Sequence, residues 1–272
     1  MVKARESWKL AIYRDASAAS EAAADQVAAT IANESEVTIS LPTGSTPLVM
    51  YDILAARAAR GEIDFSGVHL FCLDEYVGVT PEDRVSLTRW LRDAFLQRVG
   101  FRDDQVHPLP STGGDLVAAA SEFDQAIAAR GGLDLAVLGL GPNGHVGYNE
   151  PGSNADSRTR VVTLTPESRR QATAYWEGTA EIPNRAMTMG VETLLEAKQI
   201  VLLVTGEAKA DMLRRSLEEP MSADVPASWL RIAGPRLTVI ADEAAASKLS
   251  AAQRGPSTAP EERGGDSLDE AP

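Results

Sequence analysis

Short runs of apolar residues alternate along this chain with longer segments in which apolar residues recur every three or four positions. The short runs are typical of buried strands, and the longer segments are typical of amphipathic helices. Strands are expected at 37–41, 68–73, 133–139, 200–205 and 237–240. Helices are expected at 16–32, 47–60, 86–99, 116–130 and 207–217. This alternation predicts an α/β fold with a mostly parallel sheet flanked by helices.

The alternating pattern extends to about residue 246, which predicts a single domain over 1–246. A chain of 272 residues with 44% hydrophobic content can bury one large core. From 247 to 272 the sequence is rich in Ser, Pro, Gly, Glu and Asp, and after Ala251 its only large apolar residue is Leu268. Such a composition predicts a disordered acidic tail over 247–272.

The formal net charge is −13, which disfavours nucleic acid and anionic lipid as partners and leaves small molecules. No apolar segment approaches the roughly 20 residues of a membrane-spanning helix, so no membrane association is expected. The single cysteine, Cys72, cannot form an internal disulfide, and no basic and apolar leader stands at the N-terminus. We therefore expect a cytoplasmic protein.

Residues able to do chemistry follow four of the expected strands. In open α/β sheets, ligands bind at the carboxyl ends of the strands, so these segments are expected to meet at one edge of the sheet. The four segments are 42–46, 74–76, 139–150 and 205–209.

Thr43, Gly44, Ser45 and Thr46 precede Pro47, a residue favoured at the first position of a helix. Backbone N–H groups and hydroxyls there can hold a phosphate, or Ser and Thr can simply cap the helix. Both readings stay open.

Three charged residues in these segments each have a functional and a structural reading. Asp74 and Glu75 can act as a proton-abstracting base or cap the following turn, and the cap is the commoner role. Lys209 can neutralise a phosphate as a point charge, although a solvated surface lysine is commoner.

The densest pattern is the glycine-rich segment 139–152, which carries His145 and Glu150. A histidine in such a loop can exchange protons near neutral pH, and Glu150 can orient it. The Gly-x-Gly-x-x-Gly spacing in this segment is a weak match to a dinucleotide site because it lies well past the first strand.

Together these segments resemble the glucosamine-6-phosphate deaminase family, which shares its fold with 6-phosphogluconolactonases. The resemblance covers about 37–243, and it rests on the strings LPTGSTP at 41–47, LDEYVG at 73–78, GHVGYNEPGS at 144–153, SRTR at 157–160 and TGEAKA at 205–210. It implies a modified Rossmann-like domain with a mobile lid at about 164–186. It also implies conversion of glucosamine 6-phosphate and water to fructose 6-phosphate and ammonia.

By this resemblance, Asp74 moves a proton from C2 of the open sugar to C1, His145 opens the ring, and Glu150 orients His145. The phosphate is bound by 43–46 and by Lys209. No metal or organic cofactor is implied, and the histidines and cysteine show no metal-ligand spacing.

Three positions depart from the family pattern. Asn143 stands where many members have Asp, and it can still hydrogen-bond to the substrate or the loop. Ala174 stands where hexameric members have a phosphate-binding lid arginine, and Arg170, one helical turn earlier, is expected to replace it. Val162 replaces a lysine of the activator site, in which Arg160 is retained.

Two alternatives remain beside the deaminase. One is a 6-phosphogluconolactonase, which needs no carbon–proton base, and the other is a non-catalytic sugar-phosphate sensor. The string at 149–152 and the presence of Asp74, His145 and Glu150 favour the deaminase. The sequence does not separate glucosamine from galactosamine phosphate, or a monomer from a homo-oligomer.

Overall fold

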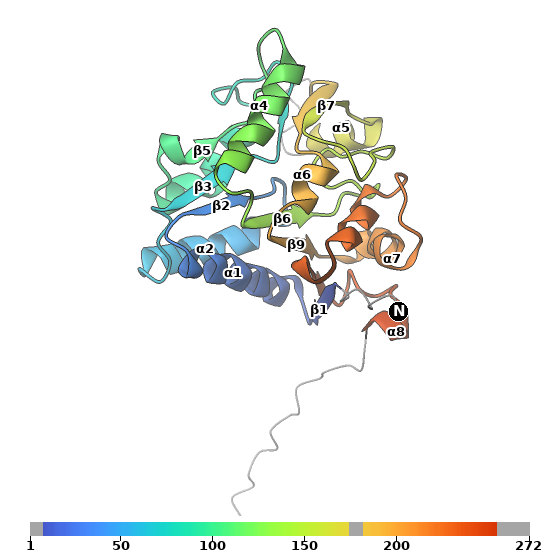
Figure 1. The fold of residues 1–272 in the computed structure, drawn as a ribbon. Coiled ribbons are helices and arrows are strands. Elements are labelled where there is room, and N and C mark those ends of the chain that lie inside the picture. The colour runs from blue at the N-terminus through green and yellow to red at the C-terminus, as the bar shows by residue number, and fades with distance from the viewer. Residues whose placement is uncertain (1–7, 174–181, 255–272) are drawn as a thin grey trace, which may run out of the picture.

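The computed structural model describes residues 8–173 and 182–254. These residues contain a seven-stranded sheet in the order β1-β10-β9-β6-β2-β3-β5, in which every neighbouring pair is parallel. The predicted α/β class is therefore confirmed (Figure 1). The strands are β1 (Lys9–Tyr13), β2 (Val37–Ser40), β3 (Val68–Phe71), β5 (Val106–His107), β6 (Leu135–Gly139), β9 (Gln199–Val204) and β10 (Leu237–Asp242).

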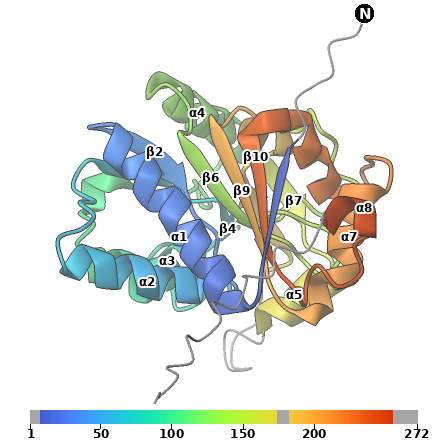
Figure 2. The same ribbon diagram turned by 90° about the horizontal axis from the view of Figure 1, so that it is seen from below.

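Helices cover both faces of this sheet, as Figure 2 shows along its edge. The first face carries α1 (Ala16–Asn33), α2 (Leu48–Ala59), α3 (Leu87–Ala94) and the 3-10 helix η1 (Leu96–Val99). The second face carries α4 (Leu116–Ala129), α6 (Val191–Leu195), α7 (Ala210–Glu218) and the 3-10 segment η5 (Pro226–Arg236).

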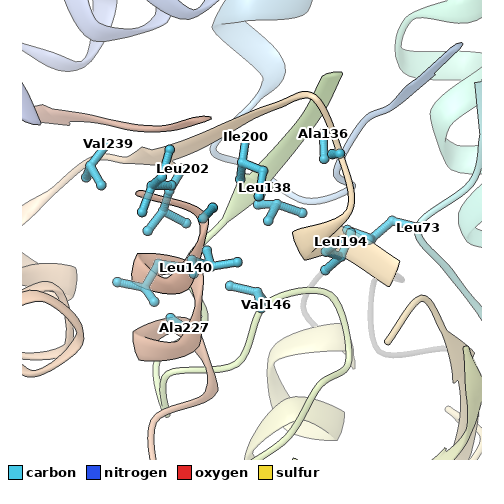
Figure 3. Packing of buried hydrophobic residues seen from close by; sticks show 14 of the residues in the cluster. Leu73, Ala136, Leu138, Leu140, Val146, Leu194, Ile200, Leu202, Ala227 and Val239 are labelled. Carbon is cyan, nitrogen blue, oxygen red and sulfur yellow. The ribbon is translucent and has the colours of Figure 1, made fainter. Parts of the chain in front are cut away.

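Strand residues alternate between the two cores with the period of two that a pleated strand imposes. In β6, Leu135 and Val137 join the first core, whereas Ala136 and Leu138 join the second. Because both faces are buried, the strands read as continuous apolar runs, and that is why they could be found in the sequence. Figure 3 shows the second core, which also holds Val146 of the glycine-rich loop.

A second, small sheet is antiparallel and has the order β4-β8-β7, formed by β4 (Asp74–Tyr76), β8 (Arg185–Thr188) and β7 (Arg160–Thr163). The strand expected at 68–73 therefore ends at Phe71, and Asp74 begins a strand of another sheet. Helix α5 (Pro166–Thr173) packs on this small sheet through a cluster that includes Tyr76, Ala172 and Ala186.

Two predicted helices are broken in the structure. The helix expected at 86–99 is interrupted at Phe95, whose φ of −142° is not helical, and continues as η1. The helix expected at 207–217 begins as the 3-10 turn η4 (Glu207–Lys209), so Lys209 stands at the N-cap of α7. A further 3-10 turn, η2 (Asp103–Gln105), precedes β5.

Parts of the predicted lid and of the predicted tail lie outside the described residues. Within the expected lid, 174–181 lies outside them, and this includes Ala174. Beyond 246, Leu249 is buried and α8 (Ala251–Arg254) follows, so ordered structure continues to 254 rather than ending at 246. Residues 255–272 lie outside the described part. None of the helices that the structure describes is long and apolar enough to cross a bilayer.

Candidate active site

The segments that follow β2, β3, β6 and β9 border one open pocket with about 740 Å³ of empty space, its mouth included. Strands β2 and β6 are neighbours, but the chain leaves them toward opposite sides of the sheet, which makes this the switch point where α/β sheets bind ligands. The lining residues are Pro42, Thr43, Gly44, Ser45, Thr46, Leu73, Asp74, Gly139, Leu140, Gly141, His145, Gly147, Tyr148, Ser168, Gln171, Ala172 and Lys209.

One wall of the pocket is the turn 43–46 in front of α2. The helix has Pro47 as its N-cap and no side-chain cap, so the hydroxyls of the turn do not serve that structural purpose. Gly44 has a φ of +100°, a conformation that glycine adopts without strain. The turn thus presents hydroxyls and a helix N-terminus to the pocket, the features of an anion site.

Lys209 lines the same pocket from the loop that follows β9. Burial lowers the pKa of its ammonium, an effect that nearby Glu167 partly opposes. The loop is held by Asp242, whose carboxylate accepts the Gly206 N–H at 3.0 Å from both oxygens. A partly desolvated cation and a hydroxyl-rich turn together suit a phosphate group.

The glycine-rich loop brings His145 to the floor of the pocket. A Cβ on Gly141 would lie 2.2 Å from Nε2 of His145, so the imidazole ring occupies the space that any side chain there would need. Gly144 has a φ of +89°, and a Cβ there would meet Val225 at 2.9 Å. Gly141 is therefore needed for close packing against His145, and Gly144 for close packing against Val225.

Behind His145 lies a buried carboxylate. Oε2 of Glu150 is 3.6 Å from Nδ1 of His145 and accepts the Asn143 side-chain N–H at 2.8 Å. Burial alone would raise the pKa of Glu150, but neighbouring His145, Ser168 and Asn143 lower it to about 2. Glu150 is thus ionised at neutral pH and faces one nitrogen of the imidazole.

Asp74 lines the pocket, and the residue is 7% exposed. Its Oδ1 is buried and, among the described residues, has no hydrogen-bond partner. Burial, and then the charge of Glu75, raise the pKa of Asp74 from 3.8 to about 7. An unpaired buried acid of this kind is costly to the fold and is typical of functional sites.

Glu75 takes the structural role that the sequence left open between the two acids. Its carboxylate accepts the backbone N–H groups of Tyr76, Leu87 and Thr88 at 2.9–3.1 Å and the Ser86 hydroxyl at 2.6 Å. Glu75 therefore anchors the start of α3, and Asp74 is left free to face the pocket.

The predicted site residues fall into three groups in the structure. Asp74, His145, Lys209 and 43–46 line the pocket, whereas Glu150 and Asn143 stand behind His145. Arg170 is exposed on α5 and is not among the lining residues of the described pocket. Tyr148, Ser168 and Gln171 also line the pocket, although nothing in their local sequence pattern distinguishes them from ordinary loop and helix residues.

Other reactive side chains contribute little to this pocket. Cys72 is buried, and burial raises the pKa of its thiol to about 12, so the thiol stays protonated at neutral pH. His69 and His107 hydrogen-bond to each other at 3.1 Å on β3 and β5. In the part of the chain that the structure describes, no three His, Cys, Asp or Glu residues are placed to hold a metal ion.

Comparisons with known proteins agree on one family. A model of the family glucosamine-6-phosphate isomerases/6-phosphogluconolactonase matches residues 14–239. Glucosamine-6-phosphate deaminase of Corynebacterium aurimucosum is 43% identical over 84% of this chain and 89% of its own length. That of Streptomyces avermitilis is 40% identical over 90% and 94%.

Solved structures give the same result. A monomeric glucosamine-6-phosphate deaminase has a TM-score of 0.84 and 33% identity, over 88% of this chain and 99% of its own. The 6-phosphogluconolactonase of Trypanosoma brucei has a TM-score of 0.69 at 21% identity, over 90% and 100%, and shares the fold. The chain belongs to the glucosamine-6-phosphate isomerase/6-phosphogluconolactonase family.

Proposed function

We propose that this chain is a glucosamine-6-phosphate deaminase, which converts glucosamine 6-phosphate and water to fructose 6-phosphate and ammonia. The observation that carries the proposal is the buried Oδ1 of Asp74, which has no hydrogen-bond partner among the described residues and belongs to the same pocket as His145. A lactonase needs a group that activates water but no base for a carbon-bound proton. Relatives named as deaminases, about 40% identical over most of the chain, support the same reaction.

In this reaction Asp74 acts as the general base that removes a carbon-bound proton from the sugar. Its carboxylate takes the proton from C2 of the ring-opened sugar, which gives an enolamine, and returns a proton to C1. The nitrogen remains on C2 as an imine, and water then replaces it to give the ketone and ammonia. A pKa of about 7 allows Asp74 to be ionised at working pH and still to be a useful base.

His145 opens the sugar ring by exchanging a proton with the ring oxygen and the C1 hydroxyl. Glu150 is ionised and lies 3.6 Å from Nδ1, so it stabilises the imidazolium form that appears when His145 takes up a proton. Asn143 donates its side-chain N–H to Oε2 of Glu150 at 2.8 Å, and this hydrogen bond keeps Glu150 in place.

We place the phosphate of the substrate against 43–46 and Lys209, which line the same pocket as Asp74. The turn offers hydroxyls and the N-terminus of α2, and Lys209 offers one positive charge. Arg170 of α5 is proposed as a further phosphate ligand. The reason is that Ala174 stands at the position where hexameric members of the family have a phosphate-binding arginine.

The proposed function also indicates a substrate class, a cellular location and an oligomeric state. The substrate class is a sugar phosphate, and a cytoplasmic site of action agrees with that metabolite. For the assembly we propose a monomer, supported by the solved relative that is described as monomeric. Light scattering on the purified protein measures this directly, and a mass of two or more chains would contradict it.

The function is tested by offering the protein two substrates in parallel. With glucosamine 6-phosphate, ammonia and fructose 6-phosphate should form in equal amounts. With 6-phosphogluconolactone, the rate of acid release should not exceed that without protein. Lactone hydrolysis without ammonia release would overturn the proposal in favour of a lactonase, and inactivity on both would favour the sensor.

A further inference from the structure

The start of α5 is bound to the carboxylate that lies behind His145. Thr165, the residue before the helix, donates its backbone N–H and its hydroxyl to Oε1 of Glu150, at 3.1 and 3.2 Å. The other carboxylate oxygen, Oε2, faces His145 and Asn143. Each oxygen of Glu150 therefore has its own set of partners, and one of those sets belongs to α5.

Ser168 completes a second connection between the same two groups. Its hydroxyl lies 3.1 Å from Oγ1 of Thr165 and 3.3 Å from Nδ1 of His145. With one proton on each hydroxyl, the donors can all point one way, from Nδ1 through Ser168 and Thr165 to Oε1 of Glu150. This route is continuous, whereas the direct approach of Glu150 Oε2 to Nδ1 is 3.6 Å and too long for a hydrogen bond.

The two hydroxyls differ in what else they do. Thr165 accepts the backbone N–H of Ser168 at 3.2 Å, which is the ordinary work of a residue at a helix start. Ser168 is 2% exposed and lines the pocket beside His145. Among the described residues its hydroxyl caps no helix end; it contacts Thr165 and the imidazole, and it also helps to lower the pKa of the Glu150 carboxylate.

We propose that Ser168, supported by Thr165, is a positioning residue that fixes the orientation and tautomer of His145. The hydroxyl chain favours a proton on Nδ1 and thereby leaves Nε2, above Gly141, to face the substrate. Because Gln171 and Ala172 of the same helix line the pocket, the placement of α5 and the orientation of His145 depend on each other. The catalytic part of this inference rests on the proposed function.

The first test uses no substrate, so it is independent of the proposed function. Protein with ¹⁵N-labelled histidine is compared by NMR as wild type, Ser168→Ala and Ser168→Thr, with His145→Gln to assign the signals. The Nδ1 and Nε2 shifts of His145 should move in Ser168→Ala and return toward wild type in Ser168→Thr. The signals of His69 and His107, which pair on β3 and β5, serve as internal references.

A matched control is available on the same helix. The hydroxyl of Thr173 donates to the carbonyl of Arg169 at 2.9 Å and lies on the exposed side of α5. Thr173→Ala removes a hydroxyl from the helix without touching Glu150 or His145, and its histidine spectrum should match wild type. Unchanged His145 shifts in Ser168→Ala would overturn the inference, whatever the activity of the protein.

The second test measures ammonia release from glucosamine 6-phosphate. Ser168→Ala should lower kcat about tenfold, the size of one hydrogen bond, with KM within about twofold of wild type. Ser168→Thr should recover most of this loss, and Thr173→Ala should behave as wild type. A kcat unchanged in Ser168→Ala would contradict the positioning role. A wild type that releases no ammonia would instead reject the proposed function, and the NMR result would still decide the tautomer.

Discussion

Replacing Asp74 with Asn should stabilise the fold at neutral and alkaline pH. The pKa of Asp74 is raised from 3.8 to about 7, first by burial and then by the charge of Glu75. Below pH 3.8 the carboxyl is protonated in both the folded and the unfolded state and has no effect. Between about pH 4 and 7 the unfolded chain loses the proton while the folded chain keeps it, so the stability of the wild type falls as the pH rises.

The size of the effect follows from the shift. About three pKa units at about 1.4 kcal/mol each give a cost of about 4 kcal/mol, reached above pH 7. This is an upper bound, because local relaxation and water entry reduce it. Asp74→Asn keeps the size of the side chain and removes the charge, so it should recover a large part of this free energy.

The assay is urea unfolding of wild type and Asp74→Asn at pH 4, 6 and 8. The difference in unfolding free energy should be near zero at pH 4 and should grow to a few kcal/mol in favour of the variant at pH 8. Groups that do not interact with Asp74 titrate alike in both proteins and cancel in this difference. Asp224→Asn, at an exposed position, is the matched control and should show no such growth. A difference that is independent of pH for Asp74→Asn would refute the account of its environment.

Three further outcomes are expected. Gly141→Ala should lower kcat at least about 100-fold, because a Cβ 2.2 Å from Nε2 displaces the ring of His145, and a kcat near wild type would contradict this packing. Arg170→Ala should raise KM about tenfold, because one charged hydrogen bond to the phosphate is lost. An unchanged KM would show that Arg170 does not bind the phosphate, which is then held by 43–46 and Lys209 alone. N-acetylglucosamine 6-phosphate should not activate the enzyme, because Val162 stands where the family pattern has a lysine and packs on the apolar cluster of the small sheet. A sigmoidal rate curve that becomes hyperbolic when this compound is added would contradict the prediction.

The sequence predicted the parallel sheet well because its central strands are buried on both faces. Strands such as β6 and β9 therefore appear as uninterrupted apolar runs. The edge strands β1 and β5 were missed, since β1 is only partly buried and β5 is two residues long. The antiparallel sheet was missed as well, because β4 pairs with a segment more than 100 residues away and no local pattern records that pairing.

The candidate site shows the same division between local and distant signals. Segments that follow the strands of a parallel sheet share its carboxyl edge, so the meeting of Asp74, His145 and Lys209 in one pocket could be predicted from their places after strands. The contacts of Glu75 and Ser168 did not follow, because each depends on the angle at which a helix meets the loop beside it. Sequence spacing does not contain that angle.

The most direct test of the account is the rate of ammonia release by Asp74→Asn from glucosamine 6-phosphate. The variant keeps the pocket, His145 and the phosphate contacts, so it should bind the substrate while its kcat falls by about 10²- to 10⁴-fold, the usual effect of removing a positioned general base. In deuterated water the wild type should incorporate deuterium at C1 of fructose 6-phosphate, and the variant should form almost no labelled product. Release of ammonia by Asp74→Asn at a rate near that of the wild type would contradict the central claim that Asp74 carries the proton from C2 to C1.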